Sequence, residues 1–296
     1  MSEVLNLRQR YAGQPIFQKG PEPEKPKKKK GLMITLIIIV LAVVLTTVGI
    51  KASDKIFSSL KVEESICPSD MIYIPTSAGG FCIDKYEASA GAGCEYGDPQ
   101  NQDQTRANLE KGDCEPVAKE GAAPWRNISQ DQAKVACAKA GKRLPANEEW
   151  LQAALGTPDT GPWEETDCQV DNNWDQQPGA CGSADNCRSS FGVYDMIGNV
   201  WEWTEGNAVD GEYKGIEMPD SGYVKGFSAQ AMPTETAPGQ ADSNYNEDFF
   251  WIKKNGTRGV ARGGYWNNKE EAGIYSVYIV APPSFAGVGV GFRCVK

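Results

Sequence analysis

A run of twenty residues without a charged side chain, from Gly31 to Ile50, constrains this chain more than any other feature. A helix of this length rises about 30 Å, the thickness of the hydrocarbon core of a bilayer, so the run predicts a transmembrane helix. A lysine-rich stretch ends at Lys30 directly before it, and the positive-inside rule places residues 1–30 in the cytoplasm. A cleavable signal peptide is the alternative, although the tail before the run is unusually long and no clear cleavage site follows.

The segments on either side of this run differ in composition. Residues 1–30 carry eight basic and three acidic side chains and several prolines, which predicts a disordered tail, and residues 51–66 form a short stalk. All nine cysteines follow the run, which indicates an oxidising compartment. We therefore expect a single-pass protein of the cell membrane, with a cytoplasmic N-terminus and a domain outside the cell over residues 67–296.

Two counts exclude several classes of function. The chain has no histidine, which excludes a Ser-His-Asp triad, a Cys-His pair and any His-ligated zinc site. After residue 50, 22 Lys and Arg side chains stand against 36 Asp and Glu, a net charge of −14. Because such a domain would repel phosphate, we expect no nucleic-acid partner.

Local patterns predict a hairpin at the start of the outer domain. Apolar runs at 71–75 and 81–86 predict two strands around a glycine-containing turn. Cys67 and Cys82 flank this hairpin, and we expect them to bridge it.

Two helices follow. Ser129 with Gln132 matches a capping box, and the helix that it starts is expected to end at Gly141. Asn147 is predicted to be the N-cap of a second helix that ends before Gly156. The long polar stretches beyond are rich in Gly, Pro and Asn and predict much irregular structure.

Four blocks of the outer domain carry a family likeness. They are GKRLPANEEW (141–150), FGVYDMIGNVWEW (191–203), ARGGYW (261–266) and GFRC (291–294). Together they closely resemble the formylglycine-generating-enzyme, or sulfatase-modifying-factor, domain, and the likeness covers residues 67–296. The resemblance implies an α+β fold of the C-type-lectin-like class, preceded here by one transmembrane helix.

Members of this family bind calcium at the GNVWEW block. The resemblance implies a structural calcium ion held by backbone carbonyls of Ile197, Gly198 and Val200 and by the Glu202 carboxylate, a donor mixture that Ca²⁺ favours. The alternative is an ion pair for Glu202. The family's second calcium site resembles residues 172–174 only loosely.

The resemblance also implies a disulfide between Cys137 and Cys294. Cys94 and Cys114 are expected to form a local bridge within an acidic insertion. The remaining three cysteines cannot all pair with one another, so the sequence leaves open which stays free: Cys168, Cys181 or Cys187.

The family's oxidase activity depends on two cysteines after the RGG block, which bind copper and activate oxygen. By position these cysteines fall near Asn268 and Gly273, and neither residue is cysteine. We therefore expect no copper and no such activity, because both the nucleophile and the soft metal ligand are missing. An enzyme of this class with altered chemistry and a structural surface subunit are the alternatives.

The segment from Ala261 to Lys296 resembles the variable region of target proteins of diversity-generating retroelements. These proteins display a ligand-binding surface on the same lectin-like fold, and adenine randomisation changes their Asn codons. The framework of such regions remains here: Arg262, Gly263, Gly264, Trp266, Ala272, Gly273, Pro283, Ser284, Gly291, Phe292 and Arg293. The slots that normally hold Asn carry other residues: Tyr278, Val280, Ala281, Phe285, Gly287 and Gly289.

The resemblance implies a ligand surface for an unknown extracellular partner, which we expect to be a protein. Tyr and Phe supply stiff contact area, and Gly and Ala open pockets between them. The alternative is that Tyr278, Val280 and Phe285 pack inward. An aromatic-rich insertion, 212–251, either walls the same site or packs on itself. The predicted surface also includes the residues after the RGG block: Tyr265, Trp266, Asn267 and Asn268.

Overall fold

The computed structural model describes residues 66–77 and 79–296. The predicted tail (1–30), the apolar run (31–50) and all but the last residue of the predicted stalk (51–66) lie outside the described residues. Within the described part of the chain, no helix combines the length and the apolar character that crossing a bilayer requires.

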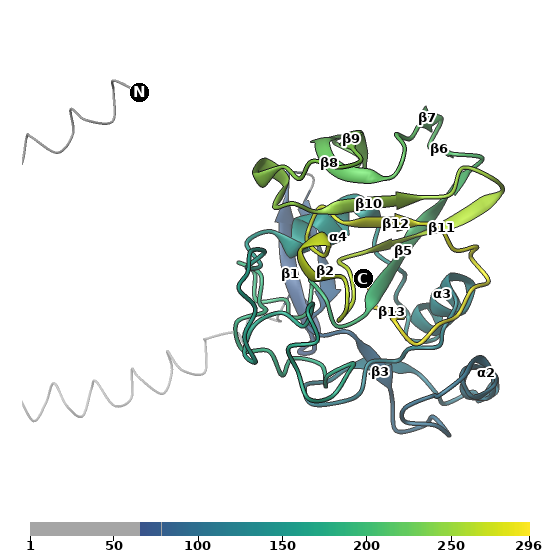
Figure 1. Cartoon of the computed structure of the whole chain (residues 1–296). Helices are drawn as coiled ribbons and strands as arrows, with labels where there is room; N and C mark the ends of the chain where they lie inside the picture. Colours follow the sequence, from purple (N-terminus) through teal and green to yellow (C-terminus); the bar gives the residue numbers. More distant parts are fainter. Residues whose placement is uncertain (1–65, 78) are drawn as a thin grey trace, which may run out of the picture. The chain divides into compact units, whose positions relative to one another are not determined.

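A curled sheet of nine strands is the largest sheet of the domain (Figure 1). Eight strands follow one another in the order β7-β6-β5-β11-β12-β10-β8-β9, and the ninth, β13, pairs with β5. The pairs β10–β12 and β13–β5 are parallel, whereas the other neighbours are antiparallel. The strands are β5 (Trp201–Val209), β6 (Glu212–Tyr213), β7 (Ile216–Glu217), β8 (Gly222–Phe227), β9 (Pro233–Ala237), β10 (Phe249–Ile252), β11 (Thr257–Arg262), β12 (Val277–Ile279) and β13 (Val290–Phe292).

Two smaller sheets of two strands each complete the β-structure. The predicted hairpin is confirmed as β1 (Met71–Thr76) and β2 (Gly79–Asp84). The second small sheet pairs β3 (Ala88–Ala90) with β4 (Pro116–Ala118). The described chain is thus mostly β-structure with few helices, which is consistent with the expected C-type-lectin-like fold.

The described helices are short: α2 (Gln102–Glu110), α3 (Gln130–Lys139), α4 (Asn147–Ala154) and the 3₁₀ turns η2 (Ser243–Tyr245) and η3 (Lys269–Glu271). The capping box of α3 is confirmed, since Ser129 Oγ accepts from the backbone N–H of Gln132 at 3.2 Å.

The predicted N-cap of α4 is wrong. Ala146 occupies that position and Asn147 is the first helical residue. The Glu149 carboxylate accepts from the N–H of Ala146 at 2.8 Å, while the side chain of Asn147 is buried and donates to the Tyr213 hydroxyl. The hydrogen bond to Tyr213 therefore engages the Asn147 side chain, which local sequence preference would place at the N-cap.

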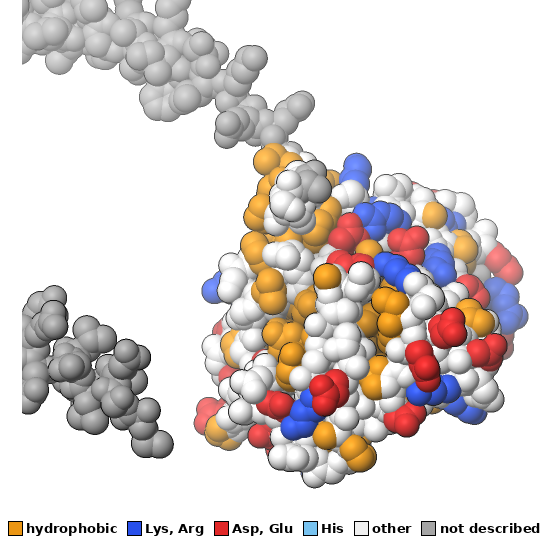
Figure 2. All heavy atoms as spheres, turned by 90° about the horizontal axis from the view of Figure 1, so that it is seen from above, with side chains coloured by type: hydrophobic (Ala, Val, Ile, Leu, Met, Phe, Trp, Pro, Cys, Tyr) orange, Lys and Arg blue, Asp and Glu red, His pale blue; other side chains and the backbone are white. Residues whose placement is uncertain are grey.

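Buried side chains form a core on both sides of the sheet. One cluster surrounds Trp150 of α4, a second contains Trp203 and Phe292, and a third contains Phe250 and Val277. Seen from above, acidic and basic side chains intermix on the surface around grouped hydrophobic side chains (Figure 2).

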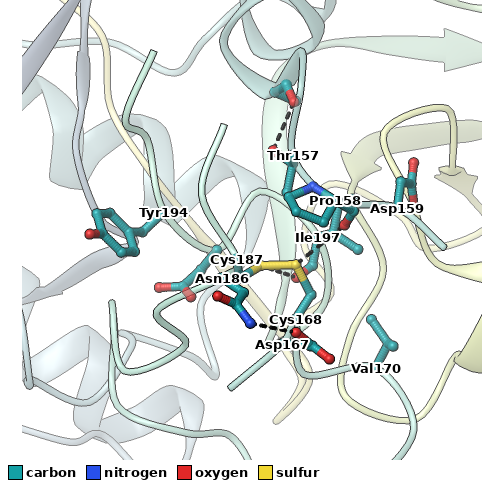
Figure 3. The surroundings of a disulfide bond; sticks show 12 residues. Thr157, Pro158, Asp159, Asp167, Cys168, Val170, Asn186, Cys187, Tyr194 and Ile197 are labelled. Atoms are coloured by element: carbon teal, nitrogen blue, oxygen red, sulfur yellow. Dashed lines mark hydrogen bonds between the residues drawn. A yellow bond between two sulfur atoms is a disulfide. The ribbon is translucent and has the colours of Figure 1, made fainter. Parts of the chain in front are cut away.

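Four disulfides link the domain. The expected pairs Cys67–Cys82, Cys94–Cys114 and Cys137–Cys294 are confirmed. The fourth pair is Cys168–Cys187, which leaves Cys181 as the free thiol among the nine cysteines. Figure 3 shows the Cys168–Cys187 bridge beside Pro158, whose carbonyl oxygen lies 3.7 Å from Cys168 Sγ.

Candidate ligand-binding site

A pocket of about 470 Å³ opens where β5, β10 and β12 meet the loop that leads into β13. We call it the aromatic pocket. No Asp, Glu, Lys or Arg among the described residues lines it. Its lining is Trp201, Trp203, Trp251, Tyr265, Asn268, Tyr278, Phe285, Gly287, Val288, Gly289 and Val290.

Strand register brings the aromatic side chains together. The parallel pairing of β10 with β12 sets Trp251 opposite Tyr278, and the pairing of β13 with β5 sets Val290 opposite Trp201. The Trp201 ring then lies 5.5 Å from the ring of Trp251, edge to face, and 5.5 Å from the ring of Tyr278. Such contacts between rings stiffen a surface before any ligand arrives.

The loop over residues 282–289 is held in place by its backbone. The N–H of Phe285 donates to the carbonyl of Pro282, and Gly287 accepts from the N–H of Asn127 at 3.0 Å. The carbonyl of Gly289 accepts from the N–H of Trp201 at 2.9 Å. None of these bonds uses a loop side chain, so the side chains of the loop can change while its path is kept.

Two glycines keep the pocket open. A Cβ atom on Gly287 would lie 2.8 Å from the ring of Phe285, and a Cβ atom on Gly289 would lie 2.9 Å from the ring of Tyr265. Side chains at these positions would push the rings aside. The identity of each residue in these two slots therefore sets the shape of the pocket.

The polar groups of the pocket are few and uncharged. Asn268 accepts from the backbone N–H of Tyr265 through its Oδ1 at 3.0 Å. Burial, followed by the neighbouring Tyr265, raises the pKa of Tyr278, so its phenol stays neutral at physiological pH. The site can bury an apolar group and offer it a small number of hydrogen bonds.

Six of the ten predicted ligand residues line the aromatic pocket: Tyr265, Asn268, Tyr278, Phe285, Gly287 and Gly289. The other four lie elsewhere. Ala281 is buried, Val280 follows the end of β12 outside the pocket lining, and Trp266 and Asn267 bond to Asn172 on another loop. Phe285 is 45% exposed, so the inward-packing alternative fails for this residue.

Sequence reasoning missed four lining residues: Trp201, Trp203, Val288 and Val290. A fifth lining residue, Trp251, belongs to the aromatic insertion that was expected either to wall the site or to pack on itself. Trp201 and Trp203 of the WEW block are both buried in the core, and both also line the pocket. Both alternatives for the aromatic insertion are realised. Trp251 walls the pocket, while Phe249 packs against Tyr223 at 5.1 Å within the insertion.

The predicted calcium block has a different set of contacts. Glu202 is buried, and its carboxylate accepts from Arg293 at 2.5 Å and from the indole N–H of Trp150 at 2.7 Å. This is the ion-pair alternative. Arg293 and Trp150 thus engage the Glu202 carboxylate of the ligand set that the resemblance implies, Ile197, Gly198, Val200 and Glu202, and the calcium ion stays a prediction. The described residues also contain no group of three or more Asp, Glu, Cys or His that could hold a metal.

The positions of the family's two cysteines hold no thiol. Asn268 lies in the aromatic pocket, and a Cβ atom on Gly273 would lie 1.9 Å from Asp248 Oδ1, so no side chain fits there. The free Cys181 is buried, and burial together with Glu87 and Asp195 raises the pKa of its thiol. A thiol that stays protonated is a poor nucleophile and a poor metal ligand.

The chain matches one family model and several curated relatives. The sulfatase-modifying factor enzyme 1-like domain matches residues 74–296. Inactive C-alpha-formylglycine-generating enzyme 2 of Bos taurus is 34% identical over 96 residues, which cover 27% of this chain and 32% of the relative. Hercynine oxygenase of Mycolicibacterium thermoresistibile is 27% identical over 203 residues, which cover 64% of this chain and 40% of the relative. The chain thus spans less than half the length of each of these curated relatives.

Among solved structures, the Major Tropism Determinant I1 variant is similar to this chain. The two are 16% identical with a TM-score of 0.42, and the match covers 78% of this chain and 53% of the other.

Proposed function

Because the chain belongs to the family of sulfatase-modifying factor enzyme 1-like domains, we propose that it is a non-catalytic member that binds a ligand in the aromatic pocket. One observation carries the proposal: six residues predicted from the final segment line a single pocket together with Trp201 and Trp251. Tyr and Trp side chains dominate the binding energy of many protein interfaces, so a protein ligand suits this surface.

The lack of catalysis is supported by the residues at the two family cysteine positions, Asn268 and Gly273. One matched relative carries the word inactive in its name. The test is oxygen uptake by the purified full-length protein with a cysteine-containing peptide and copper. We expect no uptake above that of the peptide and copper alone, whereas turnover that requires the protein would establish the enzyme alternative.

The variation of the pocket by a retroelement is part of the same proposal. The framework residues of the final segment are retained, while the slots that such systems randomise carry Tyr278, Phe285, Gly287 and Gly289. The flanking DNA tests this: we expect a reverse-transcriptase gene and a near-repeat of the 3′ end that differs at adenines. A locus that has neither the gene nor the repeat would contradict diversification by a retroelement.

The anchor is proposed from the sequence alone. Residues 31–50 would cross the membrane, with the lysine-rich tail inside and the disulfide-linked domain outside. In intact cells, added protease should degrade the domain and spare the tail. Protection of the domain would contradict this orientation.

Ligand binding is tested by randomising the pocket in the full-length protein displayed on cells. A library varied at six lining residues is screened against a panel of purified proteins, with six buried positions such as Ile279 randomised as the control. We expect most pocket variants to remain folded and some to bind one protein selectively. Equal loss of folding in both libraries would contradict the proposal.

A further inference from the structure

Two buried aspartates, Asp159 and Asp248, meet at the turn 273–276, which leads into β12. The N–H of Ile274 donates to Asp159 Oδ2 at 2.9 Å, and the next N–H along the chain, that of Tyr275, donates to Asp248 Oδ2 at 2.6 Å. Two carboxyl groups that accept from neighbouring amides of one turn lie close together. After burial, the neighbouring Asp159 is the largest cause that raises the pKa of Asp248, which agrees with this placement.

Each of the two carboxyl groups has one oxygen without a donor. Asp159 is only 8% exposed and Asp248 is completely buried. The Oδ1 atoms of both are buried and have no hydrogen-bond partner among the described residues. A buried carboxylate oxygen without a donor costs free energy, and two carboxylates this close resist being ionised together. One proton between the two Oδ1 atoms would remove both costs.

The cation beside the pair is Arg262 of β11. It is buried, donates to the backbone carbonyls of Ala231 and Ile274, and its charge acts on Asp248. With Arg262 positive, a single proton on the two acids leaves the cluster neutral. Loss of that proton would leave a buried negative charge without a counter-charge, which is costly.

The other titratable groups around the pair supply no donor to the two Oδ1 atoms. The ring of Tyr275 lies 5.2 Å from the ring of Tyr245 in η2, and burial raises the pKa of the Tyr275 phenol. Lys269 of η3 is exposed and pairs with Asp171 at 3.8 Å. The hollow beside Asp159 is lined by further carboxylates: Asp171, Glu247 and Glu270.

The pair lies at the start of two walls of the aromatic pocket. Asp248 directly precedes β10, which carries Trp251, and the turn 273–276 directly precedes β12, which carries Tyr278. The parallel pairing of β10 with β12 sets these two rings opposite each other. A bond between the two acids therefore ties the beginnings of both strands together.

The segment that carries Asp159 is braced on its other side. Asp159 follows Pro158, whose carbonyl oxygen lies 3.7 Å from Cys168 Sγ in the Cys168–Cys187 bridge, and Figure 3 shows the Asp159 side chain pointing away from that bridge. Asn246 Nδ2 also donates to Asp159 Oδ2 at 2.8 Å. The two strands are thus tied to a segment that a disulfide holds.

We propose that Asp159 and Asp248 share one proton between their Oδ1 atoms, and that the hydrogen bond so formed positions the Trp251 and Tyr278 walls of the aromatic pocket. The proton belongs to the pair rather than to one residue. Neither acid lines the aromatic pocket, so both are positioning residues. The consequence for a ligand rests on the proposed function, whereas the shared proton does not.

The first test is infrared difference spectroscopy of the full-length protein in detergent at pH 8, which detects protonated carboxyl groups. We expect Asp159→Asn, Asp248→Asn and the double variant to lose the same carboxylic-acid band to the same extent, because one proton serves both groups. The exposed Asp103→Asn should leave the band unchanged. A double variant that loses twice as much would mean two separate protons, and no loss in any variant would mean two carboxylates. Either result would overturn the proposal.

The second test is the pH dependence of unfolding. Above pH 7 the unfolded chain holds no proton on either aspartate, whereas the folded state holds one, so each pH unit raises the unfolding equilibrium constant by up to about tenfold. In urea denaturation at pH 7.5 and 8.5, the constant of the wild type should rise about three- to tenfold more than that of Asp248→Asn. Asp159→Asn serves if that variant does not fold. Equal rises in wild type and variant would contradict a shared proton.

The third test reads the pocket walls by hydroxyl-radical footprinting with mass spectrometry. Asp248→Ala should raise the oxidation of Trp251 at least twofold, with the fully buried Trp150 as the internal control. Asp248→Asn should match the wild type, because its amide can donate to Asp159 Oδ1 and accept from the N–H of Tyr275. If Asp248→Ala does not fold, the wild type at pH 9 and at pH 7.5 gives the same comparison. Unchanged oxidation of Trp251 would show that the pair does not position this wall.

Failure here is distinguishable from failure of the proposed function, because none of the three measurements uses a ligand. A pocket library that binds no protein would overturn the proposed function and leave the shared proton in place. Variants of Asp159 and Asp248 that behave like the wild type would overturn the shared proton and leave the ligand site in place.

Discussion

The final segment contains fully buried residues and exposed residues only a few positions apart. Phe292 and Arg293 are fully buried, and Arg293 pairs with Glu202 and donates to the backbone carbonyl of Asp84. Phe285 and Val288 are 45% and 54% exposed and line the aromatic pocket. Folding depends on the first kind, whereas the second kind shapes a surface that can change without unfolding the domain.

The largest effect is expected from Arg293→Ala. It leaves the Glu202 carboxylate buried without its cation, which costs about 3–5 kcal/mol of the free energy of unfolding. Urea denaturation of the full-length protein measures this, with Arg258→Ala on the outer end of β11 as the control. A loss below about 1 kcal/mol would show that the ion pair does not support the framework.

A matched pair of phenylalanines sharpens the comparison. Phe292→Ala should cost about 3–5 kcal/mol because the ring is completely buried. Phe285→Ala should cost less than about 1 kcal/mol because nearly half of the residue is exposed. Similar losses in the same denaturation experiment would erase the distinction between framework and pocket.

Buried acids predict a pH dependence of the framework. Burial raises the pKa of Asp159 and of Asp195 from 3.8 to about 7. Between about pH 4 and pH 7 the folded state therefore holds protons that the unfolded chain has released, so the free energy of unfolding should fall as pH rises across this range. Asp195→Asn should flatten the fall measured by urea denaturation at pH 4.5, 6 and 7.5, and the exposed Asp103→Asn should not. A free energy that rises over this range would contradict the buried environment of these acids.

The smallest effect is expected from a chelator. Because Glu202 is already paired with Arg293, we expect the framework at this block to be stable without calcium. Excess EDTA should shift the melting temperature by less than about 1 °C, and re-added calcium should not raise it. A chelator-induced drop of several degrees that calcium reverses would restore the calcium site implied by the family likeness.

Local signals predicted several elements of the fold. The hairpin of β1 and β2, the capping box of Ser129 and the Cys67–Cys82 bridge depend on neighbours in sequence, and each is present. The cap of α4 was mispredicted because Asn147 bonds to Tyr213 from a distant strand. Tertiary contacts of this kind leave no trace in local sequence patterns.

The candidate site was predictable only in part for the same reason. The positions of the final segment followed from its framework, but Trp251 joins them through the parallel pairing of β10 with β12. Parallel register between distant strands cannot be derived from the residues of either strand. The unpartnered oxygen of Asp159 likewise emerges only when its three-dimensional neighbours are known.

The most direct test of the account is the pattern of natural variation in the final segment. The gene is sequenced from many isolates of the same species, and non-synonymous changes are mapped onto the domain. The account predicts that they concentrate at the pocket residues Tyr278, Phe285, Gly287 and Gly289 and spare Phe292 and Arg293. An invariant pocket in isolates that differ elsewhere in the domain would contradict a binding surface built to vary.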